Sequence, residues 1–164
     1  MTNKIRVFVT GGTFDKEYNE FDGKLFLKDT HLREMLQLGR CGLDMETRTL
    51  MMIDSTDMTD TDREIIRKNC QESDTERIVI THGTDTMAET AKYLGETIKD
   101  RTVVLTGAMV PYTFGSSDGL FNLGSAIAFA QSLPHGVYIA MNGRYFSCKN
   151  VRKNTSSGRF EEIE

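Results

Sequence analysis

The chain of 164 residues has little of several residue types that direct a protein to a specialised class. It has no tryptophan, two prolines and only three cysteines, Cys41, Cys70 and Cys148, which fit neither a zinc site nor a disulfide framework. Its three histidines include no i, i+4 pair, which argues against a zinc-binding helix. No apolar run approaches the roughly 20 residues of a membrane-spanning helix. We therefore predict no bound metal, no other cofactor and no membrane partner.

The chain also lacks a strong charge of either sign. Its 20 basic and 24 acidic residues give a formal net charge of −4, which argues against a nucleic-acid partner. The N-terminus enters an apolar run of only four or five residues, shorter than the roughly 7–15 of a secretory signal. Together with the unpaired cysteines, this leads us to expect a cytoplasmic protein.

What the chain does contain is a regular alternation of strand and helix patterns. Short β-branched and apolar runs predict strands over residues 5–10, 45–53, 77–81, 102–106 and 137–141. Helical patterns between them predict helices over 30–38, 60–72, 84–98 and 120–132, with Thr30 as a cap and with Ile65 and Ile66 facing inward. Asp22-Gly23 predicts the turn of a hairpin within residues 14–28. This alternation predicts an α/β fold, an open and mostly parallel sheet with helices on both faces.

Polar and glycine residues follow four of the predicted strands. The exits read Thr10-Gly11-Gly12-Thr13, Asp54-Ser55-Thr56-Asp57, Thr81-His82-Gly83-Thr84-Asp85-Thr86 and Thr106-Gly107-Ala108-Met109. Helix capping is the commoner explanation for any single Ser, Thr or Asp at such a place, but four exits together exceed what capping requires. Because the carboxyl ends of parallel strands share one edge of a sheet, we predict the active site at that edge.

The chemistry available at this edge is limited. Residues 10–13 lack the Gly-Lys-Ser/Thr of a phosphate loop and the Gly-x-Gly-x-x-Gly of a dinucleotide site, so a nucleotide is disfavoured. A hydroxyl nucleophile beside backbone amides remains, and it needs a base. Asp85 beside Thr84 is one candidate, and a lysine from the acid-free basic stretch 144–159 is another. That stretch is equally explained as a solvated face. We expect its polar part, residues 154–158, to fold over the crevice as a loop.

The four exits, in this order and over most of the chain, resemble those of the bacterial-type L-asparaginases, and His82-Gly83-Thr84-Asp85-Thr86-Met87 is the most specific stretch. The resemblance implies hydrolysis of L-asparagine to L-aspartate and ammonia through an acyl-enzyme. It implies that Ser55 and Thr56 bind the substrate α-carboxylate, that Asp85 binds the α-amine, and that Ala108 makes a backbone contact near the oxyanion. The catalytic residues implied are Thr13 as nucleophile, Tyr18, Thr84, Asp85 and Lys153, and the substrate-binding residues are Gly12, Ser55, Thr56, Gly83, Asp85 and Ala108.

Two features depart from the family pattern. The stretch 14–20 is not the small-residue loop commonest in the family. The family also has a smaller C-terminal domain, which in the larger members lends an acidic residue to a neighbouring active site. We expect residues 1–164 to form one catalytic domain with no second domain, as a naturally short member that assembles into a homo-oligomer.

Other functions stay open at this point. One extra methylene is worth only about 1–3 kcal/mol of discrimination, so a glutaminase or another amidase is an alternative. A noncatalytic module that binds an amino acid is a second alternative. A third is the ammonia-producing subunit of a tRNA amidotransferase, which needs a partner protein and further domains.

Overall fold

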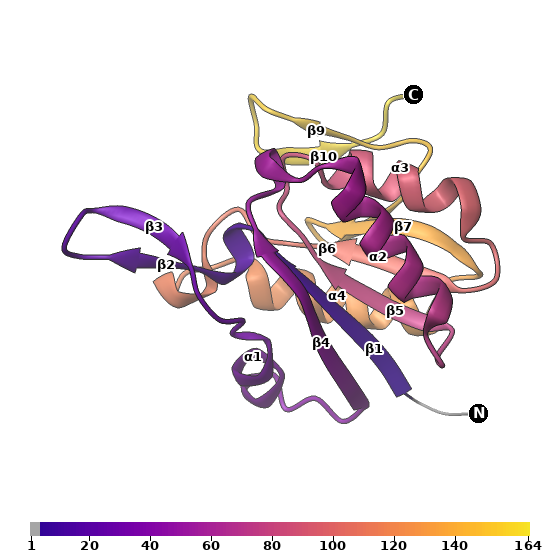
Figure 1. Ribbon diagram of the computed structural model, residues 1–164, viewed down its shortest axis with the longest axis horizontal. Helices are drawn as coiled ribbons and strands as arrows, with labels where there is room; N and C mark the ends of the chain where they lie inside the picture. Colours follow the sequence, from indigo (N-terminus) through magenta and orange to yellow (C-terminus); the bar gives the residue numbers. More distant parts are fainter. Residues whose placement is uncertain (1–3) are drawn as a thin grey trace.

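The computed structural model describes residues 4–164 as one six-stranded sheet between two layers of helices (Figure 1). Residues 1–3, which precede the N-terminal apolar run, lie outside the described part. The sheet contains five parallel strands in the order β4-β1-β5-β6-β7, followed by the antiparallel strand β8. Its strands are β1 (Lys4–Gly11), β4 (Asp44–Ile53), β5 (Arg77–Thr81), β6 (Thr102–Thr106), β7 (Gly136–Met141) and β8 (Arg144–Ser147). The predicted open, mostly parallel α/β fold is confirmed.

The helices cover both faces of the sheet and give the protein two apolar cores. Helices α2 (Asp60–Glu72) and α3 (Met87–Thr97) pack on one face, while α1 (Leu32–Leu38) and α4 (Gly119–Ser132) pack on the other. The central strands supply both cores because successive side chains of a strand point to opposite faces. In β5, Ile78 and Ile80 join the first core and Val79 joins the second, and all three are fully buried.

Three short 3₁₀ helices and two hairpins complete the fold. The 3₁₀ helices are η1 (Thr13–Asp15), η2 (Ser55–Asp57) and η3 (Tyr112–Phe114), and the hairpins are β2 (Lys16–Asn19) with β3 (Lys24–Leu27) and β9 (Arg152–Asn154) with β10 (Arg159–Glu161). The β2–β3 hairpin projects away from the sheet (Figure 1), and its turn falls at the predicted Asp22-Gly23. Among residues 4–164, no helix is long and apolar enough to cross a membrane.

Several local predictions are wrong. Ile66 is buried, but Ile65 is 43% exposed, because neighbouring helical residues point about 100° apart and only one of them can face the core. Helix α1 begins at Leu32 after His31, so Thr30 is not the cap, although its hydroxyl accepts the Leu32 N–H at 3.2 Å.

Two further differences concern the ends of elements near the sheet edge. Helix α3 begins at Met87 instead of residue 84, because the stretch 82–86 is held by contacts with the neighbouring strand exits. The stretch predicted as a loop over 154–158 is a turn over residues 155–158, which joins β9 to β10, and it differs from the prediction in that Asn154 is the last residue of β9.

The strand order places a topological switch point between β1 and β5. From β1 the chain moves outward to β4 on one side, then returns to β5 and continues through β6 and β7 on the other. In open α/β sheets, ligands bind outside the carboxyl ends of the strands at such a point. The exits of β1 and β5 therefore define the place where a site is expected.

Candidate active site

Glycines allow the exits of β1, β4 and β5 to meet without side chains between them. A Cβ on Gly12 would lie 2.4 Å from both Cα and N of Gly83, and a Cβ on Gly83 would lie 2.6 Å from the Ser55 hydroxyl oxygen. Gly12 also has a left-handed φ of 84°, which favours glycine. Any larger residue at these two positions would push the exits apart. The two glycines thus bring the segments that carry Thr13, Ser55 and Thr84 against one another.

Most hydroxyl groups at the exits tie the loops together. Thr10 donates to the Thr81 carbonyl at 2.7 Å, Thr106 donates to the Ala140 carbonyl at 2.8 Å, and Thr86 donates to the Ser55 carbonyl at 2.9 Å. These bonds explain why so many threonines follow the strands. They leave fewer hydroxyls available for chemistry than the sequence contains.

A polar cluster at the strand exits joins Lys153, Thr84 and Asp85. The Lys153 ammonium, on β9, lies 2.8 Å from the Thr84 hydroxyl oxygen and 2.8 Å from Asp85 Oδ1. Thr84 is buried and the Lys153 side chain is 14% exposed, whereas the Asp85 side chain is 56% exposed. An ion pair that holds an amine against a buried hydroxyl is suited to moving a proton at that hydroxyl. Lys153 lies 69 positions after Thr84 and 68 after Asp85 in the chain, and the structure brings it to them.

The turn after β4 carries Ser55 and Thr56. Ser55 is buried, and its hydroxyl oxygen accepts the Thr86 N–H at 3.3 Å, so its hydrogen remains available for donation. Asp54 caps the turn and accepts both the N–H and the hydroxyl of Thr56, at 3.2 and 3.0 Å. A ligand carboxylate at Thr56 would therefore compete with Asp54 for the same two hydrogens.

Asp54 is itself held by Lys16, a residue that the sequence analysis did not select. The Lys16 ammonium lies 2.5 Å from Asp54 Oδ2, and this bond holds the pKa of Asp54 below its usual range. Lys16 begins β2, and its carbonyl accepts the Thr113 hydroxyl at 3.1 Å. No periodicity links positions 16 and 54, so only the folded chain reveals this pair.

Thr13 and Tyr18 lie on the segment that leads into the β2–β3 hairpin. Thr13 is half-buried and directly follows Gly12 at the start of η1. Tyr18 is 54% exposed, and its hydroxyl lies 3.9 Å from the Cβ position of Gly23, at the hairpin turn. The structure thus places Thr13 at the strand exits and the Tyr18 hydroxyl at the far end of the hairpin.

Hydrogen bonds fix the backbone on both sides of Ala108, in the loop after β6. Ala108 is fully buried, and Asn122 donates to the preceding Gly107 carbonyl at 2.8 Å. The Asp118 carboxylate accepts the backbone N–H groups of Met109 and Val110 at 2.9–3.1 Å. These bonds fix the backbone around Ala108, as a backbone contact to a ligand requires.

A buried hydrogen-bond network around His82 supports the backbone that follows β5. The fully buried His82 contacts the Gly83 carbonyl with Nδ1 at 2.7 Å and the Thr90 hydroxyl with Nε2 at 2.8 Å. Because a carbonyl can only accept, Nδ1 carries the hydrogen and Nε2 accepts from Thr90, which in turn accepts from Arg63 at 3.1 Å. Burial lowers the pKa of His82 to about 4, against the opposing effect of the Gly83 bond. His82 is therefore a neutral support of the Gly83 backbone.

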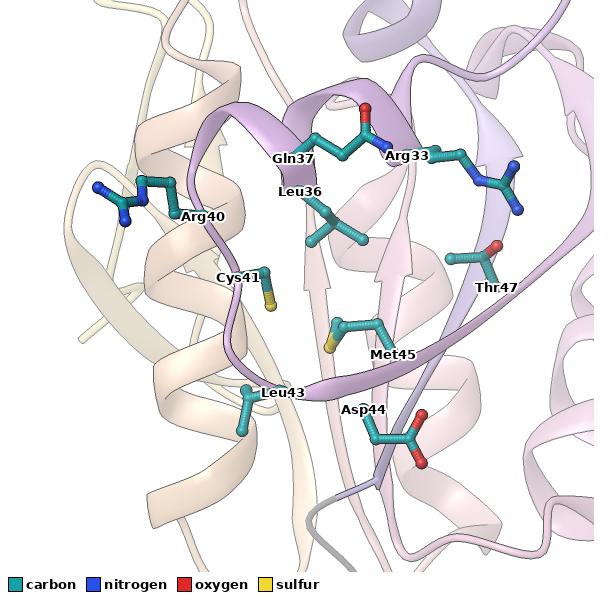
Figure 2. A pocket seen from close by; sticks show the side chains of 9 residues that line it. All are labelled: Arg33, Leu36, Gln37, Arg40, Cys41, Leu43, Asp44, Met45 and Thr47. Atoms are coloured by element: carbon teal, nitrogen blue, oxygen red, sulfur yellow. The ribbon is translucent and has the colours of Figure 1, made fainter.

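A separate hollow lies at the other end of the sheet. A pocket of about 580 Å³ lies between α1 and the first residues of β4, at the amino end of that strand. Figure 2 shows the side chains that line it. Side chains from both elements and from the loop between them line it, among them Leu36, Cys41 and Met45, which point toward one another in Figure 2. None of the residues predicted for the site lines this pocket. Within residues 4–164, no group of three or more His, Cys, Asp or Glu side chains could hold a metal ion.

The fold is that of an α/β protein whose strand exits gather hydroxyl, amine and carboxylate groups at the switch point of its sheet, which makes this edge a candidate site for a small molecule. The family model for the N-terminal domain of asparaginase matches residues 4–162, and the chain belongs to the asparaginase family.

Individual relatives agree with this assignment. The L-asparaginase of Thermococcus kodakarensis is 34% identical over 160 residues, which cover 94% of this chain and 49% of that protein. A solved structure of the thermostable L-asparaginase from the same organism superposes with a TM-score of 0.86 at 34% identity, covering 98% of this chain and 51% of that one. A glutaminase-asparaginase of Acinetobacter glutaminasificans is 46% identical over 80 residues, 46% of this chain and 24% of that protein. The chain thus spans no more than about half the length of these relatives.

Proposed function

We propose that the protein hydrolyses the side-chain amide of L-asparagine, releasing L-aspartate and ammonia. Membership of the asparaginase family supports this reaction class. The observation that carries the proposal is the contact of Lys153 with both Thr84 and Asp85 at 2.8 Å, beside the glycine-lined exit that holds Thr13. This arrangement offers a hydroxyl nucleophile, a second hydroxyl bonded to an amine, and a carboxylate that orients the amine.

The reaction proceeds in two steps through an ester on Thr13. The Thr13 oxygen attacks the amide carbon of the substrate, the carbon–nitrogen bond breaks, and the hydroxyl proton leaves with the nitrogen as ammonia. Water then attacks the ester carbon, the carbon–oxygen bond to Thr13 breaks, and the proton of the water returns to Thr13. Lys153 and Thr84 relay these protons, and Asp85 keeps the amine against Thr84. Tyr18 assists Thr13 only after the hairpin that carries it moves toward the strand exits.

The substrate is held by its charged ends. We assign the α-carboxylate to the Ser55 hydroxyl and to the Thr56 turn, where it displaces bonds that Thr56 now makes to Asp54. The exposed carboxylate of Asp85 receives the α-amine, and the backbone around Ala108 contacts the oxyanion region. Gly12 and Gly83 supply close backbone approach where a side chain would fill the crevice.

Assembly is a second part of the proposal. The family resemblance implies that a carboxylate from a neighbouring chain helps to hold the α-amine, and the family model that matches residues 4–162 is that of the N-terminal domain. We propose that the enzyme forms a homo-oligomer. Several exposed apolar side chains of the projecting hairpin support association, namely Tyr18, Phe21, Leu25 and Phe26.

An amidase assay over a substrate panel tests the reaction. Ammonia release is measured with asparagine, glutamine, a β-aspartyl amide and an N-acyl asparagine, for the wild type and for Thr13→Ala. We expect asparagine to be the best substrate and Thr13→Ala to be inactive. One relative is named a glutaminase-asparaginase. A preference for glutamine would change the assigned substrate and leave the proposed mechanism in place. Binding of asparagine without any ammonia release would favour the noncatalytic module instead.

A further inference from the structure

The turn between β7 and β8 contains an asparagine in an unusual backbone conformation. Asn142 has a φ of 60° and Gly143 has a φ of 75°, so two successive residues adopt the left-handed region. This is the geometry of a type I′ hairpin turn, for which Asn-Gly is a preferred pair. The turn explains the positive φ of Asn142 but does not explain the role of its side chain.

The side chain and the backbone of Asn142 connect two distant parts of the protein. Its Oδ1 accepts the Phe160 N–H of β10 at 3.1 Å, and its own N–H donates to Asn122 Oδ1 at 3.3 Å. Asn122 also donates to the Gly107 carbonyl at 2.8 Å, next to Ala108. Two asparagines therefore connect the loop after β6 to the β9–β10 hairpin.

Phe160 is the residue directly opposite Lys153 in that hairpin. Since the Phe160 N–H donates to Asn142, it is not available to Lys153, and the two residues form a non-hydrogen-bonded pair of the antiparallel ladder. Residues paired in this way have their side chains close together on one face. On that face the Phe160 ring is buried in the core, and the Lys153 amine reaches Thr84 and Asp85.

We propose that Asn142 is a positioning residue that sets the distance of Lys153 from Thr84 by holding the backbone of Phe160. Without this bond the hairpin remains attached through the Phe160 ring. The Arg144–Glu162 ion pair and the bonds of Ile163 and Glu164 to Asn150 hold the segment after β10, but they do not hold the backbone directly opposite Lys153. The catalytic consequence rests on the proposed function, whereas the placement of Lys153 can be measured without turnover. Because Asn122 shares the network, the same bonds connect the hairpin of Lys153 to the loop that carries Ala108.

Three changes isolate the bond. Asn142→Gly keeps the turn, because glycine adopts a φ of 60° without strain, and it removes the acceptor. Asn142→Asp keeps an acceptor oxygen and tolerates the same turn. Replacement of Phe160 by its α-hydroxy acid analogue turns the backbone N–H into an ester oxygen, so the donor is lost while every side chain stays. Asn150→Gly is the matched control, because Asn150 also accepts backbone N–H groups, those of Ile163 and Glu164 at 2.8 and 3.1 Å, neither of which is paired with Lys153 in the hairpin.

The first readout needs no activity. We expect the ¹³Cε resonance of Lys153 to move toward that of a solvent-exposed lysine in Asn142→Gly and in the Phe160 ester. It should stay at the wild-type position in Asn142→Asp and Asn150→Gly. An unmoved resonance in both the glycine variant and the ester would overturn the proposal, even if the wild type proved to have no amidase activity.

The second readout is the division between kcat and KM for asparagine. A misplacement of about 1 Å costs on the order of 100-fold in rate, so kcat should fall by roughly that factor in Asn142→Gly, with KM within about twofold. Asn142→Asp should recover most of the lost rate. A purely structural role would lower the melting temperature and leave kcat per folded molecule unchanged, and that result would refute the positioning role. An inactive wild type would instead count against the proposed function alone.

Discussion

Lys16 and Asp54 form an ion pair of 2.5 Å that connects the base of the β2–β3 hairpin to the turn carrying Ser55 and Thr56. The relationship matters because the turn is proposed to bind an anion while a carboxylate already lies within it. The Lys16 ammonium compensates that carboxylate. Loss of the Lys16 ammonium would leave the negative charge of Asp54 uncompensated beside the incoming α-carboxylate.

We expect Lys16→Met to raise the KM for asparagine more than it lowers kcat. The loss of one charged hydrogen bond is worth about 1.5–3 kcal/mol, and partial exposure of the pair brings the expected rise to roughly tenfold. Steady-state kinetics on asparagine measure the change. Lys24→Met is the control, since Lys24 is an exposed lysine of the same hairpin. Equal KM values for the two variants would show that Lys16 acts only as a surface charge.

The second prediction concerns the nucleophile. Thr13→Ala should reduce turnover by several orders of magnitude and leave asparagine binding largely intact, because a covalent step cannot proceed without the hydroxyl. Single-turnover assays of ammonia release and calorimetric binding to the variant measure the two effects. Retention of a tenth of the wild-type rate would exclude Thr13 and move the role to Thr84, the hydroxyl that Lys153 contacts.

The third prediction is a pH dependence of stability that arises from His82. Its pKa is about 4 in the folded protein and about 6.5 in an unfolded chain, so the unfolded state binds more protons between these values. The contribution of neutral His82 is therefore fully present above about pH 6.5 and is lost as the pH falls toward 4. The loss amounts to about 3 kcal/mol over this window.

Urea unfolding at pH 7 and at pH 4 measures this contribution when the wild type is compared with His82→Asn. Asparagine has no titration in this range, yet its N–H can still donate to the Gly83 carbonyl. Carboxylates titrate equally in both proteins, so the difference between their pH profiles isolates His82. Parallel profiles would contradict a neutral, buried imidazole at this position.

The fold was predictable from sequence where burial is two-sided. Strands 77–81 and 102–106 match β5 and β6 to the residue, because strands covered on both faces read as unbroken apolar runs. Strand β8 was missed although Asn142-Gly143 is a strong hairpin signal, because Arg144–Ser147 is a half-exposed strand at the edge of the sheet.

The candidate site was predictable only in part, for a different reason. Residues that follow strands gather at one edge by topology, so the exits of β1, β4, β5 and β6 could be assigned to one crevice. Lys153 came from the family resemblance, since nothing in its local sequence says which hydroxyl it contacts. Lys16 and Asn142 act through side-chain contacts between segments far apart in the chain, and such contacts leave no periodic pattern.

The last prediction tests whether Lys153 takes part in catalysis or is a solvated surface charge. Lys153→Met removes the amine that bonds Thr84 and Asp85 and keeps most of the side-chain volume. If Lys153 relays protons, kcat at neutral pH should fall by about 10²- to 10⁴-fold, the usual share of general acid–base catalysis. Lys149→Met removes the same charge from the same basic stretch at an exposed position, and it should leave kcat unchanged.

Steady-state rates for both variants at low and high salt distinguish a catalytic lysine from a solvated one. An exposed charge acts only through long-range effects that salt screens, and both substitutions share these effects. Equal and small losses in the two variants would make the basic stretch a solvated face, and the hydroxyl of Thr84 would then need another base.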